Sequence, residues 1–306
     1  MKIAAIVVTY NRKELLLECI EALLRQKTNA AMDIIIIDNN STDGTAAAVE
    51  KYIRYNQIVY CNTGANLGGA GGFQYGMRYA AERGYTHAWV MDDDCIPRKT
   101  ALQVFVNEDV RLHGKYGWLS SKAIWKDGSL CCMNVQRKNI WQKVKDFQSD
   151  TVPVVMASFV SLFIPTSVIL EMGLPIKEFF IWTDDWEFTR RISREYPCFL
   201  CNKSVVIHKS NINIGANIAT DTADRLGRYA FLYRNDVYLY RREGIRGLLY
   251  ETVRLSWHIL RVFLYAKNDK RERLSLICNG TIKGLSFRPR IEYIALYSDT
   301  KKEKGR

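Results

Sequence analysis

Three adjacent aspartates, Asp92, Asp93 and Asp94, stand at the end of an apolar run over residues 87–91. Neighbouring carboxylates repel one another, so such a triplet is unfavourable unless a cation lies among them. Mg²⁺ and Mn²⁺ prefer oxygen ligands, often one or two carboxylates together with the phosphate groups of a substrate. A divalent ion held here would also neutralise a departing diphosphate. An acidic loop or helix cap is the other interpretation, and the position at the end of an expected strand favours the metal.

A second acidic group consists of Asp184, Asp185 and Glu187, which are interspersed with Trp182 and Trp186. An aspartate in apolar surroundings beside another acid has a raised pKa, which suits a general base. Aromatic faces also suit sugar rings. The other interpretation is an ordinary helix start, with Asp184 or Asp185 as the N-cap.

A single histidine, His208, follows the apolar run 205–207. A lone histidine after a strand is more often structural than a ligand. His208 therefore matters only if both acidic groups are functional, and it would then complete a metal site.

The segment Asn66–Gly72 is rich in glycine and imitates a phosphate-binding loop. A dinucleotide fingerprint would follow the first strand, where Thr9-Tyr10-Asn11-Arg12 stands instead, so we reject a nicotinamide cofactor. The glycines favour close approach of the backbone to a nucleotide or to the next strand.

The elements that must position these residues alternate between strands and helices. Apolar, β-rich runs over 3–9, 33–38, 57–61 and 87–91 predict strands, and helical spacing separates them. Such repeats predict an α/β fold with a mostly parallel, Rossmann-like sheet flanked by helices. Ligands bind such sheets at the carboxyl ends of the strands. Three of the runs end in suitable polar residues, which begin at Thr9, Asp38 and Asp92.

Charge is distributed unevenly along the 306 residues. Residues 225–306 hold 19 Lys and Arg against 8 Asp and Glu, whereas the rest of the chain holds 25 against 24. We therefore predict a catalytic domain over 1–221 and a basic helical region over 222–306. The catalytic domain divides into a nucleotide-binding half, 1–97, and an acceptor half, 98–221.

The basic region predicts contact with an anionic partner, which we interpret as a membrane surface. Within it, 245–264 reads as a basic, partly amphipathic helix. A solvated helical appendage or the interface of a homo-oligomer would also explain the composition. The sequence contains no apolar stretch long enough to span a bilayer and no export signal. We therefore expect a cytoplasmic protein, peripheral on the inner face of the cell membrane, with its eight cysteines reduced.

Four segments in order carry a family resemblance. They are Val7-Val8-Thr9-Tyr10-Asn11-Arg12, Ile37-Asp38-Asn39-Asn40-Ser41-Thr42-Asp43-Gly44-Thr45, Asn66-Leu67-Gly68-Gly69-Ala70-Gly71-Gly72 and Asp92-Asp93-Asp94. Together they resemble glycosyltransferase family 2, which has the GT-A fold. The resemblance implies that the first two segments hold the nucleotide, through Thr9, Asn11, Arg12 and Asp38, with Asn66 and Asp93 beside them. It also implies that the acidic triplet binds the metal and diphosphate.

The segment Trp182-Thr183-Asp184-Asp185-Trp186-Glu187-Phe188, followed by His208, looks like the bacterial galactofuranosyl- and rhamnosyl-transferase branch. By that resemblance Asp185 is the catalytic base, and Asp92, Asp94 and His208 surround Mn²⁺ or Mg²⁺. We expect Trp182, Asp184, Trp186 and Glu187 to bind the acceptor.

The resemblance implies an inverting transfer of a sugar from a nucleoside-diphosphate sugar to a hydroxyl of a glycan or lipid-linked glycan, in bacterial cell-surface polysaccharide synthesis. UDP-galactofuranose is the favoured donor and dTDP-rhamnose the alternative. Two other classes are a nucleotidyltransferase and a basic nucleic-acid-binding protein. The first lacks its phosphate-gripping loop after the first strand, and the near-neutral first 224 residues fit the second poorly, so we expect no nucleic acid partner.

Overall fold

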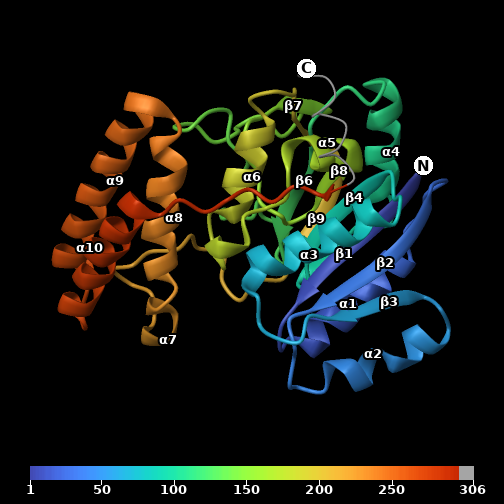
Figure 1. Cartoon of the computed structure of the whole chain (residues 1–306), viewed down its shortest axis with the longest axis horizontal. Helices are drawn as coiled ribbons and strands as arrows, with labels where there is room; N and C mark the ends of the chain where they lie inside the picture. Colours follow the sequence, from blue (N-terminus) through green and yellow to red (C-terminus); the bar gives the residue numbers. More distant parts are fainter. Residues whose placement is uncertain (296–306) are drawn as a thin grey trace.

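Four strands and three helices alternate through the first part of the chain, as the sequence predicts. They are β1 (Lys2–Thr9), α1 (Lys13–Leu24), β2 (Ala31–Asp38), α2 (Thr45–Arg54), β3 (Ile58–Asn62), α3 (Gly68–Glu82) and β4 (His87–Asp92). β1 pairs in parallel with both β2 and β4, and β2 pairs in parallel with β3. β1 is buried along nearly its whole length because helices cover both faces of this part of the sheet (Figure 1).

The second part of the chain extends the same sheet with mixed strand directions. Its elements are β5 (Cys95–Pro97), α4 (Ala101–Arg111), β6 (Leu119–Trp125), β7 (Thr151–Pro153), β8 (Leu162–Pro165), α5 (Thr166–Met172), the 3₁₀ turn η1 (Lys177–Phe179), α6 (Asp184–Ile192) and β9 (Phe199–His208). Within the described residues the sheet has nine strands in the order β3-β2-β1-β4-β8-β6-β9-β5, with β7 beside β9. β8 is antiparallel to both β4 and β6. The expected parallel arrangement therefore holds for the first part of the sheet and gives way to a mixed one beyond β4.

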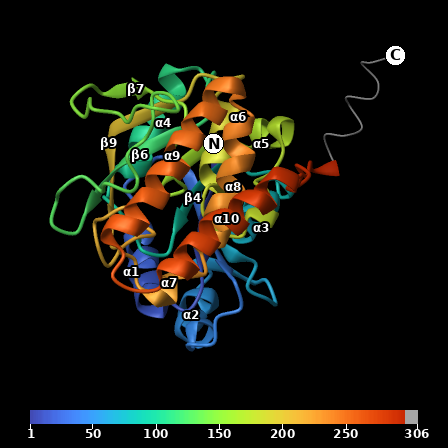
Figure 2. The same ribbon diagram turned by 90° about the vertical axis from the view of Figure 1, so that its left-hand side faces the viewer.

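Among the described residues of the basic region four helices follow, as the sequence predicts: α7 (Ala223–Leu226), α8 (Tyr229–Arg241), α9 (Gly244–Tyr265) and α10 (Lys270–Ser286). The computed structural model describes residues 1–295, so residues 296–306 of that region lie outside the described part. Helices α8, α9 and α10 pack together on one side of the molecule (Figures 1 and 2). The chain then returns to the sheet, where the Leu174 amide donates to the Glu292 carbonyl at 2.8 Å and Ile294 is buried. No helix among the described residues is long and apolar enough to cross a membrane.

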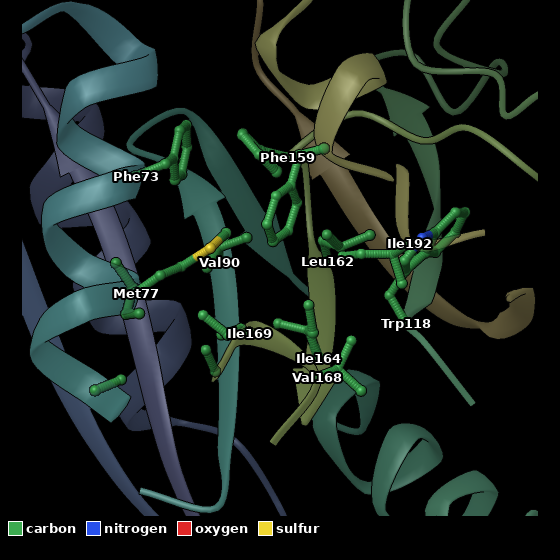
Figure 3. Close-up of a cluster of buried hydrophobic side chains, with 14 of the residues drawn as sticks. Phe73, Met77, Val90, Trp118, Phe159, Leu162, Ile164, Val168, Ile169 and Ile192 are labelled. Atoms are coloured by element: carbon green, nitrogen blue, oxygen red, sulfur yellow. The ribbon is translucent and has the colours of Figure 1, made fainter. Parts of the chain in front are cut away.

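Helix α3 packs against the sheet through a buried hydrophobic core (Figure 3). Phe73 and Met77 of α3 pack among buried side chains from β4, β8 and α5. On the face of α3 toward the sheet, a Cβ added at Gly72 would lie 2.5 Å from the Val8 side chain, and one at Gly76 would lie 2.4 Å from Ile6. Gly72, from the glycine-rich segment, and Gly76, beyond it, therefore let the helix backbone lie directly on β1, which is not the next strand along the chain.

Candidate active site

The carboxyl ends of three parallel strands meet at one edge of the sheet. Thr9 at the end of β1 is in register with Asp38 at the end of β2, and Val8 is in register with Asp92 at the end of β4. The three polar strand ends singled out in the sequence are therefore neighbours. This edge is where α/β sheets bind ligands.

The acidic triplet lies under a cationic side chain at this edge. The Thr9 hydroxyl donates to Asp93 Oδ2 at 2.7 Å. One guanidinium nitrogen of Arg12 donates to Asp93 Oδ1 at 3.3 Å and to Asp94 Oδ2 at 2.9 Å. Burial, opposed by Arg12, raises the pKa of Asp93 to about 6, and burial together with the charge of Asp94 raises the pKa of Asp92 to about 7. The triplet thus holds more negative charge than its immediate surroundings neutralise.

His208, at the end of β9, reaches the triplet through Asp94. Its Nε2 lies 3.1 Å from Asp94 Oδ1, and its Nδ1 lies 2.8 Å from Asn134 Oδ1. Because that amide oxygen only accepts, Nδ1 must carry a proton, and Nε2 faces the carboxylate. Burial alone would lower the pKa of His208, but the contact with Asp94 and the nearby carboxylate charges raise it to about 10. Asp94 and His208 therefore need a shared cation, which is either a second proton or a metal ion.

Asp92, Asp94 and His208 offer ligand atoms of the kinds that a divalent metal accepts, although they do not form a complete coordination site. Within residues 1–295 no three His, Cys, Asp or Glu side chains already surround a common point closely enough to hold a metal. Asp94 Oδ1 is buried and accepts no well-aligned hydrogen bond from any described residue. An orphaned carboxylate oxygen facing an imidazole nitrogen, with the Asp92 carboxylate nearby, presents the oxygen and nitrogen ligands that Mn²⁺ and Mg²⁺ accept.

The second acidic group begins helix α6 after a strained segment. Phe180, Trp182 and Thr183 have positive φ angles of 63°, 64° and 69°, which non-glycine residues adopt only when the surrounding structure imposes them. Neither Asp184 nor Asp185 is the N-cap, because both lie inside the helix and Thr183 precedes them. The alternative of a conventional aspartate cap is therefore wrong.

Burial sets the protonation of this second group. It raises the pKa of Asp184 to about 7. The pKa of Asp185 is raised well above its ordinary value by burial and by the charge of Asp184, and the charge of Asp92 raises it further. Asp185 Oδ1 accepts a hydrogen bond from the Trp186 amide at 2.7 Å. Because the charge of Asp92 acts on Asp185, the two acidic groups belong to one region of the molecule.

Helix α8 holds the strained segment, which the sequence did not predict. The Asn235 side-chain amide donates to the carbonyls of Phe179, Ile181 and Trp182 at 3.0, 3.2 and 2.9 Å. The Thr183 hydroxyl donates to Asp236 Oδ1 at 2.5 Å. No sequence signal could have revealed these contacts, since they join a loop to the middle of a helix far along the chain.

The start of α3 packs against the other side of the same segment. The Ala70 amide donates to the Phe180 carbonyl at 3.1 Å. A Cβ at Gly68, whose φ is +70°, would lie 2.2 Å from that carbonyl oxygen. The glycine-rich segment therefore approaches the backbone of the strained segment as well as β1.

The predicted acceptor residues have different surroundings. Trp182 packs edge-on against Tyr229, with ring centroids 5.2 Å apart, and joins the apolar cluster of the C-terminal helices. Trp186 is half-buried under the Arg137 guanidinium, 4.3 Å from the ring centroid. Glu187 is buried and paired with Arg191 at 3.1 Å, so the structure gives it a structural partner.

The remaining predicted nucleotide residues shape the loops at the sheet edge. The buried Asp38 accepts hydrogen bonds from the Ser41 amide at 2.8 Å and from the Tyr60 hydroxyl at 2.5 Å. Asn11 Oδ1 accepts from the Thr42 amide at 2.7 Å. Asn66, two residues before α3, accepts from the Gly68 amide at 2.9 Å. Asn11 and Asn66 are exposed, whereas Asp38 acts through the turn that it closes.

Comparisons with known proteins agree with this geometry. Residues 4–111 match the model of the family described as glycosyl transferase family 2. Galactofuranosyltransferase GlfT1 of Mycolicibacterium smegmatis is 25% identical over 275 residues, which cover 84% of this chain and 89% of that protein. Galactofuranosyltransferase GlfT1 of Mycobacterium tuberculosis is 24% identical over 271 residues, covering 84% of this chain and 88% of that protein.

Solved structures share the fold at low sequence identity. Residues 1–349 of TarS from S. aureus superimpose with a TM-score of 0.57 and 14% identity, covering 94% of this chain and 72% of that one. GalNAc-T7, solved with UDP, GalNAc and Mn²⁺, superimposes with a TM-score of 0.59 and 13% identity, covering 80% of this chain and 51% of that one. The fold and the matches define the class: the chain is a glycosyltransferase with a GT-A fold, and residues 4–111 are similar to glycosyl transferase family 2. Within that class it is similar to the galactofuranosyltransferases named above.

Proposed function

We propose that this enzyme transfers galactofuranose, with inversion, from UDP-galactofuranose to a hydroxyl of a glycan or lipid-linked glycan in bacterial cell-surface polysaccharide synthesis. The observation that carries the proposal is that two acidic groups from distant segments lie close enough for the charge of Asp92 to raise the pKa of Asp185. The names of the relatives, which match along most of this chain, support the choice of sugar.

Asp185 is the proposed catalytic base. It is half-buried beside Asp184, and burial together with the charge of Asp184 raises its pKa well above the ordinary value. A carboxylate with a raised pKa is a stronger base toward the proton of the acceptor hydroxyl. As the acceptor oxygen bonds to the anomeric carbon, its proton passes to Asp185 and the bond to the diphosphate oxygen breaks. One displacement inverts the configuration at that carbon.

Asp92, Asp94 and His208 are the residues that would hold Mn²⁺ or Mg²⁺. A bound divalent ion supplies positive charge that stabilises a departing diphosphate. The Arg12 guanidinium lies 2.9 Å from Asp94 and adds a second positive charge at the same edge. Thr9 and Arg12 orient Asp93, while Asn11, Asp38 and Asn66 fix the loops proposed to hold the nucleotide.

The donor is testable with the purified full-length enzyme. We expect UDP-galactofuranose with Mn²⁺ to raise the melting temperature, since a ligand that binds only the folded state stabilises it. It should also release UDP when a galactan acceptor is added, and the new linkage should have inverted stereochemistry by NMR. Stabilisation and turnover with dTDP-rhamnose alone would contradict the proposed sugar while leaving the class intact.

The same proposal places the enzyme in the cytoplasm, peripherally on the anionic inner face of the cell membrane, where lipid-linked acceptors lie. The excess of Lys and Arg in residues 225–306, 19 against 8 Asp and Glu, supports this placement. Cell fractionation tests it. The enzyme should sediment with membranes at low salt and be released in part by high salt.

A further inference from the structure

Helix α9 uses one face to pack against its neighbours. Arg254 pairs with Asp236 of α8 at 2.6 Å and with Glu251 of its own helix at 2.7 Å. Val262 is buried, and Leu255 and Ile259 pack against the same cluster. The inner face of α9 therefore packs against the rest of the protein.

The opposite face of α9 is apolar and exposed. Its large exposed residues are Ile245, Leu248, Leu249, Val253, Trp257, Leu260, Phe263, Leu264 and Tyr265. Most of them recur at intervals of three and four residues, so they form one stripe along a helix of 22 residues, about 33 Å long. The helix lies at the outer side of the bundle, where Figure 2 looks directly at it. A surface helix normally turns a polar face outward.

Charge at the ends of this stripe indicates what covers it. Between residues 242 and 272, all of them described, the exposed charged side chains are basic at Arg242, Arg246, Lys267, Lys270 and Arg271 and acidic at Asp269 and Glu272. No carboxylate on α9 itself is exposed, since Glu251 is buried. Two copies of the chain pairing through this stripe would bring their excess positive charges together. A bilayer with anionic headgroups meets them with opposite charge.

We propose that the outer face of α9, the stripe Ile245–Tyr265, inserts into the interface of an anionic lipid bilayer with the helix lying parallel to the membrane plane. An amphipathic helix with aromatic and aliphatic residues on one face and basic residues beside it binds membranes in this way. The helix does not cross the bilayer, because its inner face carries the buried Arg254–Glu251–Asp236 ion pairs. This inference deepens the proposed membrane placement by naming the helix and by adding apolar insertion to charge attraction.

Flotation of the full-length protein with vesicles tests this face without any sugar donor, so its outcome is independent of the proposed reaction. The vesicles contain phosphatidylcholine alone or phosphatidylcholine with phosphatidylglycerol. Val253 is 68% exposed on α9, and Val110 is 67% exposed on α4, so Val253→Gln and Val110→Gln are a matched pair. Leu249→Gln combined with Val253→Gln enlarges the effect. All keep the net charge, and melting curves confirm that each variant folds.

We expect the wild-type protein and Val110→Gln to float with the anionic vesicles. The double variant should partition roughly tenfold less or more weakly still, because two buried aliphatic contacts with lipid are lost. Equal flotation of the double variant and wild type overturns the proposal. A wild-type protein that does not float also overturns the proposal. If that protein is a dimer in solution and Val253→Gln dissociates it, the stripe pairs with a second copy instead.

Discussion

The two acidic groups contain the same kind of side chain in opposite electrostatic settings. Asp93 and Asp94 lie within 3.3 Å of the Arg12 guanidinium, and Asp94 also faces His208. Within residues 1–295, neither Asp184 nor Asp185 forms an ion pair. Their pKa values are raised chiefly because burial leaves the charges uncompensated. The first group is arranged to share positive charge, and the second is arranged to take up a proton. Aspartates at different positions in the fold therefore have different proposed functions.

We expect the largest effect from a substitution at Asp185. Asp185→Asn removes the proton acceptor while keeping the shape, and general-base catalysis contributes typically 10²–10⁴-fold. We expect kcat to fall by about three orders of magnitude in steady-state transfer assays. The control is Glu187→Gln, which makes the equivalent acid-to-amide change at a buried, ion-paired residue. It should affect the melting temperature more than kcat. Near-normal turnover by Asp185→Asn would assign the base elsewhere.

Removal of the metal tests the first group. Chelation by EDTA should lower transfer by about a hundredfold or more, because the charge that stabilises the leaving group is lost. Mn²⁺ or Mg²⁺ should restore activity to wild type and much less to His208→Gln. Undiminished activity in EDTA would mean that Arg12 and His208 alone neutralise the triplet.

The contact between Thr183 and Asp236 tests whether the strained segment positions the second group. Thr183→Val removes the hydroxyl at nearly constant volume, whereas Thr183→Ser keeps it. We expect kcat to fall about tenfold in Thr183→Val because a misplaced base loses alignment with the acceptor. The donor KM should stay the same, and Thr183→Ser should recover most of the rate. A parallel loss in both variants would contradict the role of the hydroxyl, because Thr183→Ser keeps it.

The smallest expected effect concerns stability. The folded-state pKa of Asp184, about 7, lies above its ordinary value, so its contribution to stability is fully present below pH 4 and is lost as pH rises through 7. Asp184→Asn removes this dependence. Its melting temperature should therefore gain a few degrees on wild type between pH 4.5 and pH 8. Asp150→Asn, at an exposed site, is the control and should show a flat difference.

Much of this site was predictable because it depends on local patterns. The apolar runs ending at Thr9, Asp38 and Asp92 fix parallel strands, and parallel strands bring their ends to one edge. The mixed second part of the sheet was not predictable, because β7 and β8 have only three and four residues and carry little periodic signal.

The partners that orient the site could not be read from the sequence. Asn134 fixes the tautomer of His208, yet it lies in an irregular stretch without a motif. Asn235 looks like an ordinary helical residue until α8 packs against the strained loop. The sequence predicts an amphipathic helix over α9, but not that Arg254 turns inward while the apolar stripe faces outward. The spacing of apolar residues in the sequence predicts a helix, but it does not determine what each face of that helix contacts.

The central claim is that the first acidic group serves the leaving group and the second serves the acceptor. Its most direct test is to measure by calorimetry the binding of UDP with Mn²⁺ to Asp94→Asn and Asp185→Asn. The wild-type enzyme and Asp185→Asn should bind UDP with equal, Mn²⁺-dependent affinity, although only the wild type transfers sugar. Asp94→Asn should lose the dependence on Mn²⁺. Equal loss of Mn²⁺-dependent binding in both variants, or its retention in Asp94→Asn, would contradict the assignment of the leaving group to one acidic group and the acceptor to the other.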